Sequence, residues 1–151
     1  YLSGVFPKTA NETISHGPLD LVWCPDSGLL QLKQSYSLEE MYGNNYGYRS
    51  GLNQSMVDHL FHKAKYLEKL CELSSNDLVV DIGSNDATFL KAITVKNITR
   101  VGIDPSGEKF REFYTDSIEL ITEFFPSEKF NESYKGRKAK FIIFRWSKCN
   151  R

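Results

Sequence analysis

The chain has 151 residues and no net formal charge, because 19 Lys and Arg balance 19 Asp and Glu, and 40% of its residues are hydrophobic. This composition predicts a globular protein, and the absence of net charge gives no argument for binding nucleic acid or an anionic membrane surface. No apolar stretch reaches the roughly 20 residues of a membrane span, and the first residues lack the pattern of a signal peptide. We therefore expect a cytoplasmic protein with no nucleic-acid or membrane partner.

The three cysteines, Cys24, Cys71 and Cys149, are widely spaced and odd in number, which does not indicate a disulfide framework. A reducing cytoplasm is the simplest interpretation. No two of them have the CxxC spacing of a metal site.

Residues 1–51 are rich in Gly, Pro, Ser, Asn and Tyr, and they predict a small amino-terminal lobe. Apolar runs at 19–23 and 29–32 flank Pro25-Asp-Ser-Gly28, a strong turn sequence, so we expect a β-hairpin. Apolar residues at steps of three and four predict a long linking helix over 52–71, with Asn53 or Ser50 as its cap.

The second region, residues 52–151, alternates apolar runs with amphipathic stretches, which is typical of an α/β fold with a Rossmann-like parallel sheet. The expected strands lie at 78–82, 100–103, 118–121 and 139–144, and the expected helices at 86–95, 106–114 and 127–134. In a sheet of order 3-2-1-4 the fourth strand lies at an edge. Its run Phe141-Ile-Ile-Phe144 would then expose apolar side chains, which predicts self-association through that edge.

Two of these strands end in an acid, Asp81 and, 23 residues later, Asp104. Gly83 after the first acid lets the backbone approach a ligand, while the Asp104 carboxylate can accept hydrogen bonds from ribose hydroxyls and Asp81 can accept one from an ammonium group. The fingerprint of a dinucleotide-binding site has three glycines in this turn. The single glycine and the acid both fit S-adenosylmethionine better than NAD. The plainer alternative is a turn that merely ends a strand.

Four segments carry a family resemblance: Asp81-Ile-Gly-Ser-Asn-Asp-Ala-Thr-Phe-Leu90, Gly102-Ile-Asp-Pro-Ser106, Tyr46-Gly-Tyr-Arg-Ser-Gly-Leu-Asn-Gln-Ser-Met56 and Cys24-Pro-Asp-Ser-Gly-Leu-Leu-Gln-Leu32. Together they resemble the S-adenosylmethionine-dependent C-methyltransferases that act on nucleotide-linked deoxy-keto-sugars. The resemblance covers about residues 18–140 and implies a zinc-binding-like lobe followed by the first half of a methyltransferase domain.

By that resemblance Tyr46 and Tyr48 face the reaction site, and the cofactor is held by residues of the two strand ends, namely Asp81, Gly83, Asn85, Asp104, Pro105 and Ser106. A sugar enolate would attack the sulfonium methyl group. A tyrosine phenol is a poor general base at neutral pH, so a hydrogen-bonding or positioning role suits both tyrosines better.

The chain departs from the family in three places. Of the zinc ligands only Cys24 is present, with Ser27 at its partner's position, so we expect no tightly bound zinc and a buried Cys24. Ala87 replaces a usual glycine, which costs about 1 kcal/mol if the position needs positive φ and nothing if it lies in a helical turn. After Lys140 the match ends, which suggests a truncated or frame-shifted fragment.

That departure keeps two rival functions open. A non-catalytic cofactor-binding or interaction module derived from the same fold would need no complete catalytic site. Half of a nicotinamide-dependent enzyme would also use Asp104 for a ribose, although the single glycine disfavours it.

Overall fold

The computed structural model describes residues 7–13, 16–35, 37, 46–115 and 117–144. The chain divides into two compact units, Tyr1–Tyr48 and Arg49–Arg151, and each is described by itself.

The first unit contains the predicted hairpin. Strands β1 (Leu21–Cys24) and β2 (Leu29–Leu32) pair antiparallel, with Leu21 opposite Leu32. The turn is closed by a hydrogen bond from N of Gly28 to O of Cys24, and Gly28 takes a φ of 68°, as its position in the turn sequence predicts.

The expectation that Cys24 is a buried apolar residue was wrong. Cys24 is partly exposed, and its thiol hydrogen-bonds to Ser27, which together with backbone hydrogen bonds from Ser27 and Asp26 lowers the thiol pKa from its usual value. The reason lies in the hairpin itself, because among the residues that the structure describes in this unit the sheet has two strands and no second layer over residue 24.

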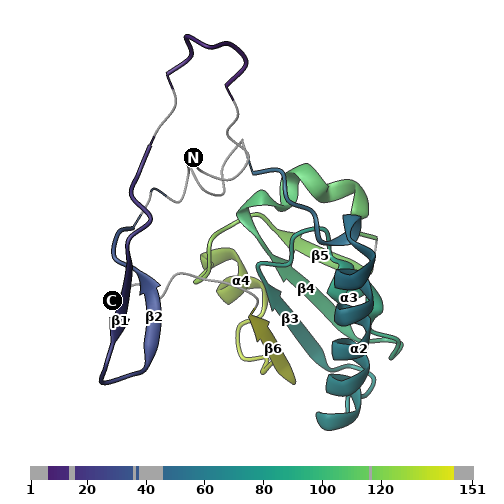
Figure 1. The fold of residues 1–151 in the computed structure, drawn as a ribbon. Coiled ribbons are helices and arrows are strands. Elements are labelled where there is room, and N and C mark those ends of the chain that lie inside the picture. The colour runs from purple at the N-terminus through teal and green to yellow at the C-terminus, as the bar shows by residue number, and fades with distance from the viewer. Residues whose placement is uncertain (1–6, 14–15, 36, 38–45, 116, 145–151) are drawn as a thin grey trace. The chain divides into compact units, whose positions relative to one another are not determined.

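The second unit is an α/β fold with a four-stranded parallel sheet (Figure 1). Its strands are β3 (Leu78–Ile82), β4 (Thr99–Ile103), β5 (Ile118–Ile121) and β6 (Phe141–Phe144). Their spatial order is β5-β4-β3-β6. Counted from β3 along the chain, this is the order 3-2-1-4, so the predicted Rossmann-like sheet is confirmed.

Both faces of the sheet are covered, as Figure 1 shows. On one face α2 (Gln54–Leu70) and α3 (Thr88–Ala92) pack over Val79 and Ile143. On the other, Phe130 of α4 (Glu128–Ser133) packs against the cluster that contains Val80 and Val101. Alternate residues of β3 thus enter two different hydrophobic clusters, as the twofold periodicity of a strand requires.

Helix α2 begins at Gln54, two residues after the predicted start, and Asn53 is the one of the two predicted caps that is confirmed. The side chain of Asn53 caps it by accepting hydrogen bonds from N of Ser55 and N of Met56, at 3.0 and 3.4 Å. Leu60 and Ala64 form its buried stripe. The short 3-10 helix η1 (Ser50–Leu52) precedes it.

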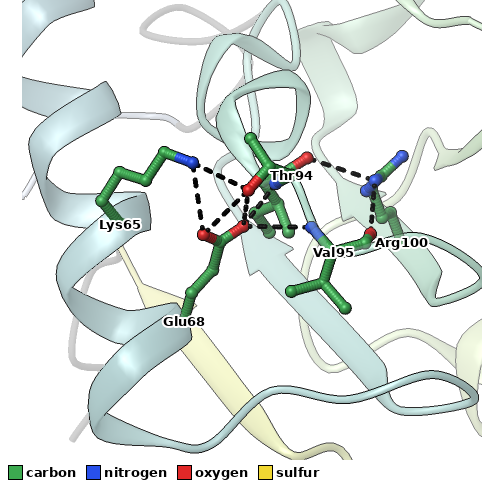
Figure 2. Close-up of polar contacts among 6 residues, drawn as sticks. Lys65, Glu68, Thr94, Val95 and Arg100 are labelled. Atoms are coloured by element: carbon green, nitrogen blue, oxygen red, sulfur yellow. Dashed lines mark hydrogen bonds and ion pairs between the residues drawn. The ribbon is translucent and has the colours of Figure 1, made fainter.

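Helix α3 is shorter than predicted, and Glu68 of α2 explains its end. N of Thr94 and N of Val95 donate to the Glu68 carboxylate, and Lys65 lies 3.6 Å from the same carboxylate, as Figure 2 shows. N of Ile93 bonds to O of Leu90, and the next two amides bond to a side chain of α2 instead of continuing the helix.

The segment after β4 is also different from the expectation. Residues Pro105–Phe113 form a 3-10 helix, η2, where an α-helix over 106–114 was predicted. Among the described residues, no helix has both the length and the apolar character needed to cross a bilayer.

Candidate functional site

The candidate site lies where β3 and β4 end. The carboxyl ends of parallel strands all lie on the same side of a sheet, and ligands of open α/β sheets bind there. Asp81 at the end of β3 is fully buried and lies opposite Gly102 of β4. Gly83 follows with a φ of 76°, a conformation that glycine adopts without strain, and its N donates to O of Ile103 at 2.8 Å.

The Asp104 carboxylate accepts three hydrogen bonds from described residues. Its Oδ1 accepts from N and Oγ of Ser106, at 2.8 and 2.6 Å, which caps η2, and its Oδ2 accepts from N of Asn85 at 2.8 Å. Only 7% of Asp104 is exposed. Within the part of the chain that the structure describes, Oδ2 accepts this one bond and keeps a lone pair for a ligand hydroxyl.

Asn85 connects three segments. Its N reaches Asp104, its side-chain Oδ1 accepts from N of Ser50 at 2.8 Å, and its carbonyl O accepts from the Tyr114 hydroxyl at 2.8 Å. The same hydroxyl lies 2.7 Å from Oγ of Ser84. Asn85 has a φ of 52°, and asparagine tolerates this left-handed conformation better than most residues.

Asp86, only 1% exposed, binds the segment before α2. Its Oδ2 accepts from N of Gly51 at 2.9 Å and lies 3.8 Å from Nη1 of Arg49. Its Oδ1 accepts from N and Oγ1 of Thr88, at 3.2 and 2.6 Å. The buried carboxylate is therefore both hydrogen-bonded and opposed by a positive charge, as a buried charge requires.

Two cations flank the ring of Phe113. The Arg49 guanidinium lies 4.2 Å from the ring centre and the Lys91 ammonium 5.5 Å from it. Burial lowers the pKa of Lys91, the positive charge of Arg49 lowers it further, and the carboxylate of Asp86 opposes both effects. The site thus has a mixed charge lining beside its turn.

Ala87 adopts a φ of 58° and caps α3 in the left-handed conformation. The sequence left two alternatives for residue 87, a helical turn or a backbone with positive φ. The structure shows the backbone with positive φ. The helix begins at Thr88 because Asn85 and Ala87 both leave the helical region. A buried alanine in this conformation stores strain, which a glycine would not.

The structure brings most of the predicted cofactor residues together. Gly83, Asn85, Asp104 and Ser106 are linked along one sheet edge by the bonds above, and Pro105 opens η2. Their roles toward a cofactor stay predictions. Tyr46 and Tyr48 belong to the other unit, so the structure does not place them against this edge, and Tyr48 is 46% exposed.

Sequence reasoning missed Asp86, Ser84, Tyr114 and the backbone of Ser50 and Gly51. Asp86 stood inside the recognised motif, and a polar Asn-Asp pair directly after a glycine turn is a signal for local side-chain-to-backbone bonds. Nothing in the sequence signals the tyrosine, whose partners are 30 residues and 29 residues away. Among the described residues, no group of three or more His, Cys, Asp or Glu is arranged to hold a metal ion.

No protein-family model and no curated protein matches the chain. Among solved structures, one similar chain belongs to the complex between the Haloferax volcanii Trm112 methyltransferase activator and a protein assigned there as a methyltransferase. The identity is 28%, and the match covers 47% of this chain and 34% of that chain, with a TM-score of 0.38. Because that score is low, the α/β assignment above depends on the strand order and not on this similarity.

Proposed function

We propose that the chain binds S-adenosylmethionine at the carboxyl ends of β3 and β4. The observation that carries the proposal is the Asp104 carboxylate, which is fixed by Asn85 and Ser106 and keeps one lone pair on Oδ2. A ribose hydroxyl can donate a hydrogen bond to such an acceptor. The glycine turn at Gly83, with its φ of 76°, leaves no Cβ between the backbone and a ligand.

The reaction class follows from the family resemblance. We propose that the chain is part of a C-methyltransferase acting on a nucleotide-linked deoxy-keto-sugar. A base removes the proton beside the ketone, and the enolate carbon attacks the methyl group. A carbon–carbon bond forms, the carbon–sulfur bond breaks, and its electron pair stays on sulfur in S-adenosylhomocysteine. Tyr46 and Tyr48 are the proposed groups that would meet the sugar.

The residues of this chain would act mainly by positioning. Asp104 would orient the ribose, the fully buried Asp81 would favour a cationic ligand, and the backbone at Gly83 would allow close approach. Pro105 and Ser106 would keep the Asp104 carboxylate in place, since Ser106 donates two hydrogen bonds to Oδ1. Ordered donors and acceptors of this kind bind a ligand without further reorganisation.

Calorimetric titration with S-adenosylmethionine, S-adenosylhomocysteine and NAD tests the proposal. The decisive variant is Asp104→Asn, which keeps an oxygen for Ser106 and removes the charged acceptor for the ribose. We expect about 10- to 100-fold weaker binding of both sulfur cofactors, the effect of losing charge-assisted hydrogen bonds. Asp58→Asn, at an exposed acid of α2, is the control. Equal affinity of both variants, measured on folded samples, would refute the site.

A second candidate is a non-catalytic interaction module built on the same fold. The observation that favours it is the edge strand β6, where Ile142 and Phe144 are 54% and 51% exposed. Methyl transfer to a keto-sugar by the purified chain would eliminate this alternative. Tight binding of NAD, together with no binding of S-adenosylmethionine or S-adenosylhomocysteine, would instead favour a nicotinamide-dependent enzyme.

A further inference from the structure

Two consecutive backbone N–H groups fasten the segment before α2 to the turn after β3. N of Ser50 donates to Oδ1 of Asn85 at 2.8 Å, and N of Gly51 donates to Oδ2 of Asp86 at 2.9 Å. The two donor residues are adjacent in the chain, and so are the two acceptor residues. Each bond joins residues that are 35 apart in the sequence. Ser50, Asn85 and Asp86 are buried, so water competes little for these bonds.

The fit at this contact depends on glycine. A Cβ added to Gly51 would lie 2.6 Å from Oδ2 of Asp86 and 3.2 Å from Oγ1 of Thr88. The close approach of this backbone to the carboxylate therefore excludes a side chain. Arg49, one residue before the two donors, adds its charge at 3.8 Å from the same carboxylate and stacks on Phe113.

The turn that holds this segment also contacts the proposed ribose acceptor. Asn85 donates from its N to Oδ2 of Asp104 while its side chain accepts from Ser50. One residue therefore contacts both the acid proposed to bind the ribose and the backbone of Ser50. A ligand that favours one geometry of the turn must favour the same geometry of the segment.

We infer that Asn85 and Asp86 form a latch, defined by their bonds to Ser50 and Gly51, which couples cofactor binding to the order of the segment 49–51. Both are positioning residues in this role. The side-chain oxygen of Asn85 accepts its hydrogen bond from the segment, at N of Ser50. The inference deepens the proposed function and rests on it for what the ligand is, while the latch itself consists of bonds between groups of the protein.

Hydrogen exchange at the Ser50 and Gly51 amides tests the latch in the full chain. Asn85→Gly removes the acceptor and keeps the left-handed backbone accessible, and Asn97→Gly is the matched control at an exposed residue with a φ of 57°. We expect the Ser50 amide to exchange about tenfold faster in Asn85→Gly than in the control, the factor for one lost hydrogen bond. Unchanged exchange would overturn the latch. Amides of β3 report whether the variant remains folded, and Asp86→Ala, which removes the acceptor of Gly51, serves if it does not.

Adding S-adenosylhomocysteine tests the coupling. The expected result is further protection of both amides in the wild-type chain, no added protection in Asn85→Gly, and recovery in Asn85→Asp, which restores an acceptor oxygen. Binding without any change in protection would overturn the coupling and leave the proposed function standing. No binding by the wild-type chain would refute the proposed function, while the ligand-free exchange would still decide whether the latch exists.

Discussion

The backbone N of Asn85 donates to the Asp104 carboxylate at 2.8 Å across 19 residues of sequence. The bond joins the segments that follow two adjacent parallel strands, β3 and β4. It forms because Asn85 leaves the helical region, at a φ of 52°, and turns its N–H toward β4. The acid proposed to hold a ribose is therefore oriented by the protein's own hydrogen bonds, which reduces the entropy that binding would otherwise cost.

Ala87 provides a test of the backbone strain in this turn. Its φ is 58° and its side chain is completely buried in the cluster under α2. Ala87→Val adds a β-branched side chain to a left-handed residue and overfills the core, and we expect a loss of about 2 kcal/mol or more in the free energy of unfolding.

Ala87→Gly is the companion variant. Relief of strain is offset by the lost methyl burial and by the greater freedom of glycine in the unfolded chain, so we expect a change within about 1 kcal/mol. Urea denaturation of both variants gives the comparison. A valine variant as stable as the wild type would show that residue 87 is not held in the left-handed region.

The strands were largely predictable because their signal is local. β3 at Leu78–Ile82 and β5 at Ile118–Ile121 have the predicted bounds, since each is a short apolar run between breakers. The order of the four strands was predicted from the doubly wound fold class alone. β6 begins at Phe141, two residues later than predicted from Ala139.

The site was less predictable because its contacts are long-range. The motif pointed to Asn85 and Asp104, yet no periodicity indicates that Asn85 would bind Ser50 or that Asp86 would bind Gly51. The end of α3 depends in the same way on Glu68, which lies 26 residues before Thr94. Tertiary hydrogen bonds of this kind override local helix propensity.

Gly51→Ala tests the closeness of the Asp86 contact. The new Cβ would lie 2.6 Å from Oδ2 of Asp86, so either the backbone or the carboxylate must move and the bond at N of residue 51 is lost. We expect a loss of about 1–3 kcal/mol in the free energy of unfolding, the range for leaving a buried polar group unsatisfied. Thermal and urea denaturation provide the measurement.

The same substitution in an Asp86→Ala background is the control for this prediction. Removal of the carboxylate makes room for the Cβ, so the cost of Gly51→Ala should fall by about 1 kcal/mol or more in the double-mutant cycle. Additive effects would place the strain elsewhere, for example at Oγ1 of Thr88, which the Cβ would approach to 3.2 Å.

Glu68 predicts a pH dependence of stability. Burial alone would raise the pKa of its carboxyl, but hydrogen bonds from Thr94 and Val95 and the charge of Lys65 outweigh burial and lower the pKa. Because the folded pKa is below the unfolded value of about 4.3, this stabilisation is complete above that value and is lost as the pH falls through the folded pKa.

Glu68→Gln isolates this contribution. At neutral pH we expect the variant to be less stable by about 1 kcal/mol, because a charged acceptor becomes neutral. Between about pH 7 and pH 3 the wild type should lose more stability than the variant, so that the two converge. Glu128→Gln, at an exposed acid of α4, is the control in urea denaturation at both pH values. Parallel pH profiles for wild type and Glu68→Gln would contradict the prediction.

The edge strand β6 predicts self-association of the chain. Ile142 and Phe144 are exposed on a parallel strand that pairs with β3 on one side, and an edge of this kind pairs readily with another chain. Ile142→Lys places a charge on that edge and should shift the protein toward monomer in sedimentation velocity, by about tenfold in the dissociation constant. Tyr66→Lys, at a residue of α2 that is 63% exposed, is the matched control. A wild-type chain that is monomeric over the whole concentration range, or a control variant with the same effect, would show that β6 is not the contact. An effect confined to Ile142→Lys would place self-association at this edge, because both variants add one positive charge at an exposed apolar or aromatic residue but on different elements.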